Sequence, residues 1–121
     1  MVRHEIKKSL ITRQAENETL FLNQFREGNY TAKNPLVVLN PYEISPLTAM
    51  ILFKTSVKQE VTVVVKGKTP EGDVRHTFPR ATEHILPIYG LYADYENTVE
   101  LILSGGERET VKIQTAPLRD S

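Results

Sequence analysis

Short runs of alternating apolar and polar side chains dominate the chain after Gly28 and constrain its fold most. In the clearest of them, Val61, Val63 and Val65 occupy every second position. A period of two is typical of β-strands with one buried face. Similar or uniformly apolar runs occur at 36–39, 47–55, 73–78, 82–89, 98–103 and 111–114.

Turn-forming residues separate most of these runs. Consecutive glycines within Ser104–Glu107 predict a tight hairpin, and Pro79 is expected to close the strand over 73–78. The sequence therefore predicts an all-β fold. We expect an Ig-like or fibronectin-like antiparallel β-sandwich of about seven short strands, preceded by an N-terminal α-helix.

The N-terminal 28 residues carry the helical pattern. Residues 5–27 contain neither proline nor glycine, and apolar side chains recur at i, i+4 spacing in Ile6–Leu10 and Phe21–Phe25. This predicts one helix, or two short ones, ending at Gly28. The polar middle, 12–19, is expected to be solvated or frayed. The apolar stripe must cover either the body of the domain or a partner chain.

Size and composition exclude several classes of protein. At 121 residues the chain is expected to form an N-terminal helical segment over 1–28 and one β-sandwich over 29–121. Fifteen basic and fifteen acidic residues leave no positive excess for gripping nucleic acid. The absence of cysteine excludes disulfides, thiolate nucleophiles and cysteine-ligated zinc. No apolar run approaches the ~18 residues of a membrane span, and the charged N-terminus does not look like a signal peptide.

Two long motifs carry a family resemblance. Asn34–Tyr42 reads Asn-Pro-Leu-Val-Val-Leu-Asn-Pro-Tyr, and Leu86–Val99 reads Leu-Pro-Ile-Tyr-Gly-Leu-Tyr-Ala-Asp-Tyr-Glu-Asn-Thr-Val. Both resemble the N-terminal domain of bacterial arylsulfate sulfotransferases, the type that does not use a nucleotide sulfate donor. The likeness runs from about Tyr30 to Thr115.

The resemblance implies a parent enzyme that moves a sulfuryl group from a phenolic sulfate ester to a phenol. It implies a sulfated histidine in the channel of a following β-propeller, and an enzyme that is exported, often periplasmic, and dimeric. No position here matches the family's catalytic residues. We therefore expect a non-catalytic scaffold and dimerisation domain without cofactors, whose partners are its own propeller domain and a second copy. The alternative is a free-standing Ig-like binding module for carbohydrate or a surface protein.

Histidines are the residues that most need testing as catalytic or metal-binding groups. A hairpin closing at 78–81 would set His76 opposite Glu83 and Arg75 opposite His84, which are ordinary cross-strand pairs. Zinc needs three or four ligands, and this group offers at most two imidazoles and one carboxylate. Histidines at adjacent positions of paired strands would also point to opposite faces of the sheet. A sulfuryl-accepting histidine would need neighbouring cations, of which Arg75 is one. No catalytic residue and no metal site is predicted.

Tyrosines cluster in the second motif, which also indicates a tyrosine corner before the penultimate strand. These rings either cap the end of the sandwich, form a protein interface, or bind a sugar or phenol. In the interface case the contact residues are predicted to be Leu20, Phe21, Phe25, Tyr89 and Tyr92.

Overall fold

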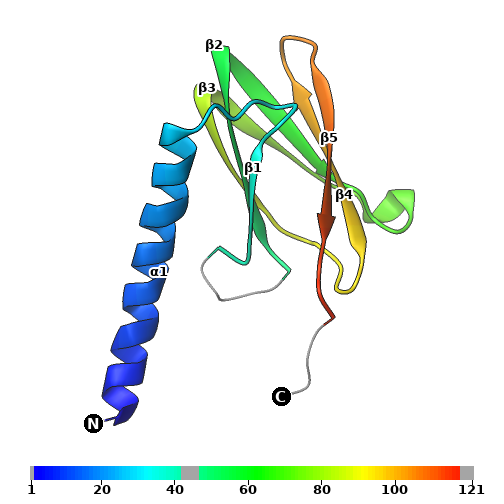
Figure 1. Cartoon of the computed structure of the whole chain (residues 1–121). Helices are drawn as coiled ribbons and strands as arrows, with labels where there is room; N and C mark the ends of the chain where they lie inside the picture. Colours follow the sequence, from blue (N-terminus) through cyan, green and yellow to red (C-terminus); the bar gives the residue numbers. More distant parts are fainter. Residues whose placement is uncertain (1, 42–46, 118–121) are drawn as a thin grey trace.

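The strands of the chain form one antiparallel sheet with a long helix beside it (Figure 1). The computed structural model describes residues 2–41 and 47–117, and the helical side chains from Gln14 onward. The β-rich, antiparallel fold is confirmed. The elements are α1 (Val2–Glu27), β1 (Leu36–Leu39), β2 (Ala49–Val65), the 3-10 turn η1 (Pro70–Gly72), β3 (Val74–Ile88), β4 (Glu96–Leu103) and β5 (Arg108–Gln114).

Strand β2 is shared by two arms of this sheet. Residues 49–54 pair with β3 on one edge, and 49–52 pair with β1 on the other. Residues 61–65 pair with the opposite end of β3 and with β4. Between these two stretches the register shifts twice, as happens where a bulge bends a strand. The sheet therefore curls, and side chains from both arms enter one core.

In the described ranges, 2–41 and 47–117, the expected seven short strands are five, because four of the expected runs join into two long strands through the bend. The runs at 47–55 and 61–66 are one strand, and so are those at 73–78 and 82–89. Pro79 does not end β3, because β2 is the one strand among the described residues with which β3 pairs. A proline on such an edge removes no hydrogen bond from a central ladder. One curled sheet, rather than two separate ones, encloses the core.

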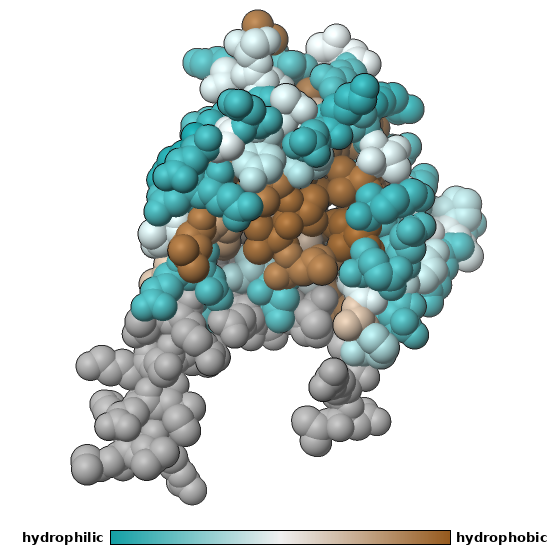
Figure 2. Space-filling model, viewed as in Figure 1, coloured by the Kyte–Doolittle hydropathy of each residue, from teal (hydrophilic) through white to brown (hydrophobic). Residues whose placement is uncertain are grey.

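The core follows the alternation read from the sequence. Ile51, Phe53, Val61, Val99 and Leu101 are each 0% exposed. Each such side chain contributes about 1.5–3 kcal/mol of transfer free energy relative to full exposure. Figure 2 shows apolar residues gathered between α1 and β5 on one face of the molecule, with hydrophilic residues around them.

The C-terminal part of helix α1 packs on β1 and β2. Phe21 and Phe25, one turn apart, pack with Met50 and Leu52 in a second apolar cluster. This places the Phe21–Phe25 part of the stripe on the body of the domain. The prediction of a helix is confirmed, as a single one, and its polar middle is helical rather than frayed.

The end of α1 is held by contacts from Lys54 and from the backbone of Gly28. The Lys54 ammonium donates to the carbonyl of Arg26 at 3.1 Å and lies 5.2 Å from the Phe25 ring centroid. A cation suits the free carbonyls of a helix C-terminus. Gly28 donates its N–H to the Gln24 carbonyl at 3.1 Å. A Cβ at Gly28 would lie 2.3 Å from the Tyr30 ring, so the close approach of that ring requires glycine.

The β4–β5 hairpin forms where the paired glycines predict it. Gly106 has φ 109°, in the region that L side chains avoid. Leu103 donates its N–H to the Glu107 carbonyl at 2.9 Å and closes the turn.

Candidate functional site

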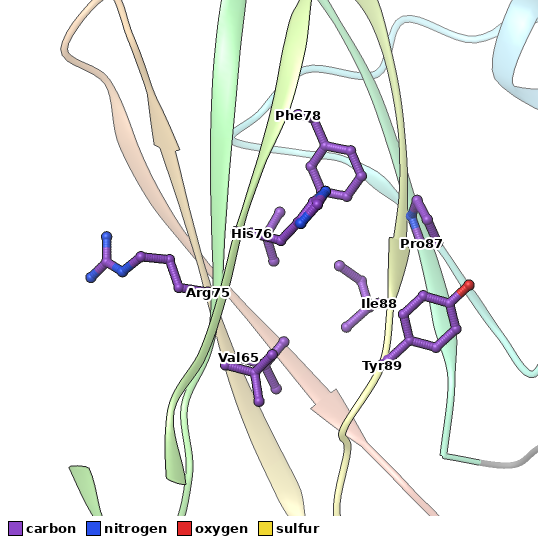
Figure 3. A pocket seen from close by; sticks show the side chains of 9 residues that line it. Val65, Arg75, His76, Phe78, Pro87, Ile88 and Tyr89 are labelled. Atoms are coloured by element: carbon purple, nitrogen blue, oxygen red, sulfur yellow. The ribbon is translucent and has the colours of Figure 1, made fainter. Parts of the chain in front are cut away.

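A hollow of about 260 Å³ opens between the two arms of β3 (Figure 3). Val63, Val65 and Ile88 line its inner part, and His76 and Phe78 form one side. The His76 and Phe78 rings meet edge to face, with centroids 4.6 Å apart. Pockets for drug-sized ligands typically measure about 300–1,000 Å³. This hollow therefore suits one ring or one large side chain.

The mouth of the hollow is apolar and exposed. Val74 is 49% and Tyr89 64% exposed, among the most exposed large apolar side chains described. Figure 3 shows Arg75 directed away from the hollow, so its guanidinium does not face the interior. The polar groups at the mouth are then the His76 imidazole and the Tyr89 hydroxyl. Such a mouth suits an apolar or aromatic contact better than an anion.

His84 is a buried side chain of β3 that lies opposite Phe53, next to the bend of β2. It is 2% exposed, and its ring stacks on Phe53 with centroids 4.8 Å apart. The Thr55 hydroxyl donates to the Val57 carbonyl at 2.8 Å. The same oxygen therefore accepts from His84 Nε2, 3.0 Å away. Desolvation by burial lowers the pKa of His84.

The cross-strand partners predicted for the two histidines, Glu83 for His76 and Arg75 for His84, are wrong. His76 lies opposite Val63 and His84 opposite Phe53, because β3 runs through 78–81 instead of turning there. The histidines consequently sit on different arms of the sheet. Among the described residues, no group of three or more histidines and carboxylates could hold a metal ion.

Tyr92 and Tyr95 join two loops at one end of the sheet. Their rings meet edge to face at 5.5 Å, and the Lys68 ammonium lies 4.8 and 5.1 Å from the two centroids. Lys68 also donates its backbone N–H to the Tyr92 hydroxyl at 3.4 Å. Cation–π contacts at exposed sites contribute about 0.5–1 kcal/mol each. These contacts tie the loop after β2 to the loop after β3.

Asn97 is the polar anchor that the sequence analysis missed. It is 0% exposed, and its Oδ1 accepts the Tyr92 N–H at 2.8 Å. Its Nδ2 lies within hydrogen-bond distance of the carbonyls of Tyr92 (3.1 Å), Tyr95 (3.1 Å) and Ile113 (3.2 Å). The Thr115 hydroxyl also donates to the Tyr92 carbonyl. An asparagine thus organises the corner for which a tyrosine was predicted. The sequence did contain a signal for this role. Asn97 is a polar residue at the start of the alternating series, continued by Val99 and Leu101, whose side chains point into the core.

Residues 36–116 match the family model of the arylsulfotransferase Ig-like domain. The chain belongs to this family. The resemblance read from the two motifs is thereby confirmed, and both motifs overlap the matched range. No solved structure matches the chain.

Two curated relatives of this arylsulfotransferase Ig-like domain carry the name of an enzyme. The chain is 35% identical over 68 residues to the arylsulfate sulfotransferase AssT of Escherichia coli O6:H1. This alignment covers 52% of this chain and 11% of that protein. The chain is 32% identical over 101 residues to the arylsulfate sulfotransferase AssT of Lelliottia amnigena. This alignment covers 78% of this chain and 17% of that protein. The chain thus spans less than a fifth of the length of either relative.

The residues predicted to form an interface lie in different parts of this Ig-like domain. Leu20 is 67% exposed and borders β1, whereas Phe21 and Phe25 are buried in the cluster under α1. Tyr89 stands at the hollow, and Tyr92 belongs to the loop contact with Lys68. The two phenylalanines therefore stabilise the chain's own fold. The interface role of this set stays a prediction.

Within the described part of the chain, no helix has the length and apolar character needed to cross a membrane.

Proposed function

We propose that this chain is a non-catalytic N-terminal scaffold and dimerisation domain of an arylsulfate sulfotransferase. The parent would transfer a sulfuryl group from a phenolic sulfate ester to a phenol, in the periplasm or outside the cell. The observation that carries the proposal is the family match over residues 36–116. This match falls in a chain that covers only 11–17% of the length of two named sulfotransferases. In proteins of that size the larger remainder has room for the catalytic apparatus.

The chemistry of the described histidines supports a non-catalytic role. A histidine that accepts a sulfuryl group needs access to substrate and donors or cations around the developing charge. His84 is buried and engaged by Thr55. His76 packs on Phe78, and the nearby Arg75 points away from the hollow that His76 borders (Figure 3).

The proposal is tested by assaying the purified 121-residue chain for sulfuryl transfer from 4-nitrophenyl sulfate to phenol. We expect no release of 4-nitrophenol above the buffer rate, while the full-length Escherichia coli relative serves as the positive control. Turnover that scales with chain concentration and disappears in a His76→Gln variant would place chemistry in this chain and refute the proposal.

The alternative, a free-standing binding module for carbohydrate or a surface protein, is favoured by the exposed Tyr89 beside the hollow. Reading the gene beyond the codon for Ser121 separates the two functions. An open frame that continues into a repeated four-stranded blade pattern supports the scaffold. A stop codon, together with binding of the purified chain to a glycan on an array, supports the free-standing binding module.

A further inference from the structure

We propose that the bend of β2 and β3 is a hinge latched by the buried His84 ring, and that protonation of this ring at mildly acidic pH releases residues 55–58 while the rest of the domain stays folded. Such a switch lies within this chain and does not depend on the chemistry of a parent enzyme. The pairing of the two strands at the bend and the contacts of His84 support it.

The bend contains more backbone in β2 than in β3. Lys54 pairs with Glu83 and Gln59 pairs with Ala81, so β2 advances five residues where β3 advances two. Three residues of β2 therefore have no counterpart in β3, as in a bulge that bends a strand. Strands β1 and β4 pair with β2 on opposite sides of this stretch, and β3 is the one described strand that accompanies β2 through it. The backbone ladder between the two arms is accordingly weakest at residues 55–58.

The His84 ring fixes these extra residues through its side-chain contacts. The ring is 2% exposed and stacks on Phe53, with centroids 4.8 Å apart. Its Nε2 donates to the Thr55 hydroxyl at 3.0 Å, and this hydroxyl donates to the Val57 carbonyl at 2.8 Å. Residues 56–58 are exposed, so their own side chains add little packing. One neutral imidazole of β3 thus holds the bulged part of β2 in place.

A charged His84 ring has no partner for its second proton. The neutral ring already uses Nε2 for Thr55, so an added proton goes on Nδ1. Within residues 2–41 and 47–117, the one hydrogen bond of this ring is the one to Thr55. A buried charge without a partner is costly, and burial is the cause that lowers the pKa of His84. Moving the charged ring into water removes this cost and breaks its contact with Thr55.

Charged side chains around the bend do not offset the cost of burying this charge. The segments that border the bend carry Lys54, Lys58 and Glu60 on β2, Arg80 and Glu83 on β3, Lys33 before β1 and Glu107 in the β4–β5 hairpin. Arg80 and Glu83, of opposite sign, line the same hollow as His84, of about 210 Å³. The Lys54 ammonium is engaged by the Arg26 carbonyl. Desolvation is the cause of the lowered pKa of His84, so none of these groups compensates for burial.

A second set of contacts holds the other side of the bend and does not titrate near neutral pH. Gln59 Oε1 accepts the Gly105 N–H at 2.9 Å. Glu60 donates its N–H to the Ser104 hydroxyl at 3.0 Å, and its carbonyl accepts the Ser104 N–H at 2.9 Å. These bonds tie residues 59–60 to the β4–β5 hairpin. Release is therefore confined to the side of the bend that His84 holds.

Amide hydrogen exchange at pH 7.5 and pH 5.5, corrected for the intrinsic exchange rate at each pH, tests the proposal. If the released ring has the ordinary pKa of about 6.5, acidification between these values favours opening by up to about tenfold. We expect amides of residues 54–60 to lose protection by several-fold, approaching about tenfold, while those of β4 and β5 change by less than about twofold.

Two matched histidine variants separate the latch from other effects of pH. His84→Gln keeps a side-chain N–H for Thr55 but cannot be charged, so its residues 54–60 should exchange alike at both pH values. His76→Gln, at the exposed histidine of the same strand, should keep the wild-type response. Far-UV circular dichroism checks that each variant is folded.

The titration of the wild-type chain followed by nuclear magnetic resonance keeps the test independent of any variant. The ring signals of His84 and the amide signals of residues 55–58 should shift with the same midpoint. Exchange of residues 54–60 that ignores pH overturns the proposal, and so does a loss of protection spread evenly over β4 and β5. A wild-type response in a folded His84→Gln variant overturns it as well.

Discussion

Replacing Asn97 with alanine should destabilise the chain by about 3–5 kcal/mol. The side chain is fully buried and serves the Tyr92 N–H and the carbonyls of Tyr95 and Ile113. Alanine would leave the Tyr92 N–H and the Ile113 carbonyl without the Asn97 amide, whereas the Tyr95 carbonyl keeps the Thr115 N–H at 3.1 Å. Each buried unpaired group costs about 1–3 kcal/mol. Since small domains have a total stability of about 5–15 kcal/mol, this loss removes a large fraction of it.

Asn97→Asp is the informative companion of this variant. A carboxylate keeps the oxygen that accepts the Tyr92 N–H, but it replaces the amide donor with an oxygen that faces carbonyl oxygens. We expect Asn97→Asp to be at least as unstable as Asn97→Ala at neutral pH, because it buries an unpaired charge. Asn29→Ala, at an exposed asparagine, is the matched control.

Urea unfolding followed by far-UV circular dichroism and tyrosine fluorescence measures these differences, since the chain has no tryptophan. Linear extrapolation of each transition gives the free energy of unfolding. If Asn97→Ala lies within about 1 kcal/mol of the wild type, the network around Asn97 does not hold this corner together. The reasoning would then be refuted.

Two further predictions concern the packing of α1 and the buried His84 of β3. Phe25→Ala should cost about 3–5 kcal/mol in the same urea assay, because it empties a buried site under α1. Leu20→Ala, on the exposed face of the same helix, should cost under about 0.5 kcal/mol. For His84, burial lowers the pKa in the folded state, so the unfolded state binds the proton more readily. Stability should therefore be fully present above the unfolded pKa of about 6.5 and fall as the pH drops below it. Urea midpoints at pH 8 and pH 5.5 should differ by more in the wild type than in His84→Gln. Equal differences would contradict the assignment.

The alternation of apolar residues predicted the strands and their inward faces because burial on one side leaves a period of two in the sequence. Val61, Val63 and Val65 face the core as predicted. The same pattern could not show that 47–55 and 61–66 are one strand. In the sequence, a bend within a strand cannot be told from a loop between two strands, because both give a mostly polar stretch such as Ser56–Glu60. Pro79 was misleading for a related reason, since proline ends a central strand but is tolerated on an edge.

The candidate site was only partly predictable. Tyr89 was identified from its clustering with other tyrosines. The hollow beside it depends on the curl that brings residues 74–78 near 87–89, and no local pattern encodes that approach. Asn97 belongs to the motif from which the corner was predicted, but it was not identified as the anchor. Its backbone partners lie in the loop after β3 and in β5, and composition does not reveal them.

The bend in β2 has a consequence for how this family can vary in length. Inward side chains occupy odd positions both before the bend, at Ile51 and Phe53, and after it, at Val61 and Val63. Losing one amino acid between Phe53 and Val61 would turn every core residue of one arm toward water unless a bulge in this stretch changed to compensate, whereas losing two would keep both arms facing inward without such a change. Insertions and deletions in this stretch should accordingly be tolerated in even numbers.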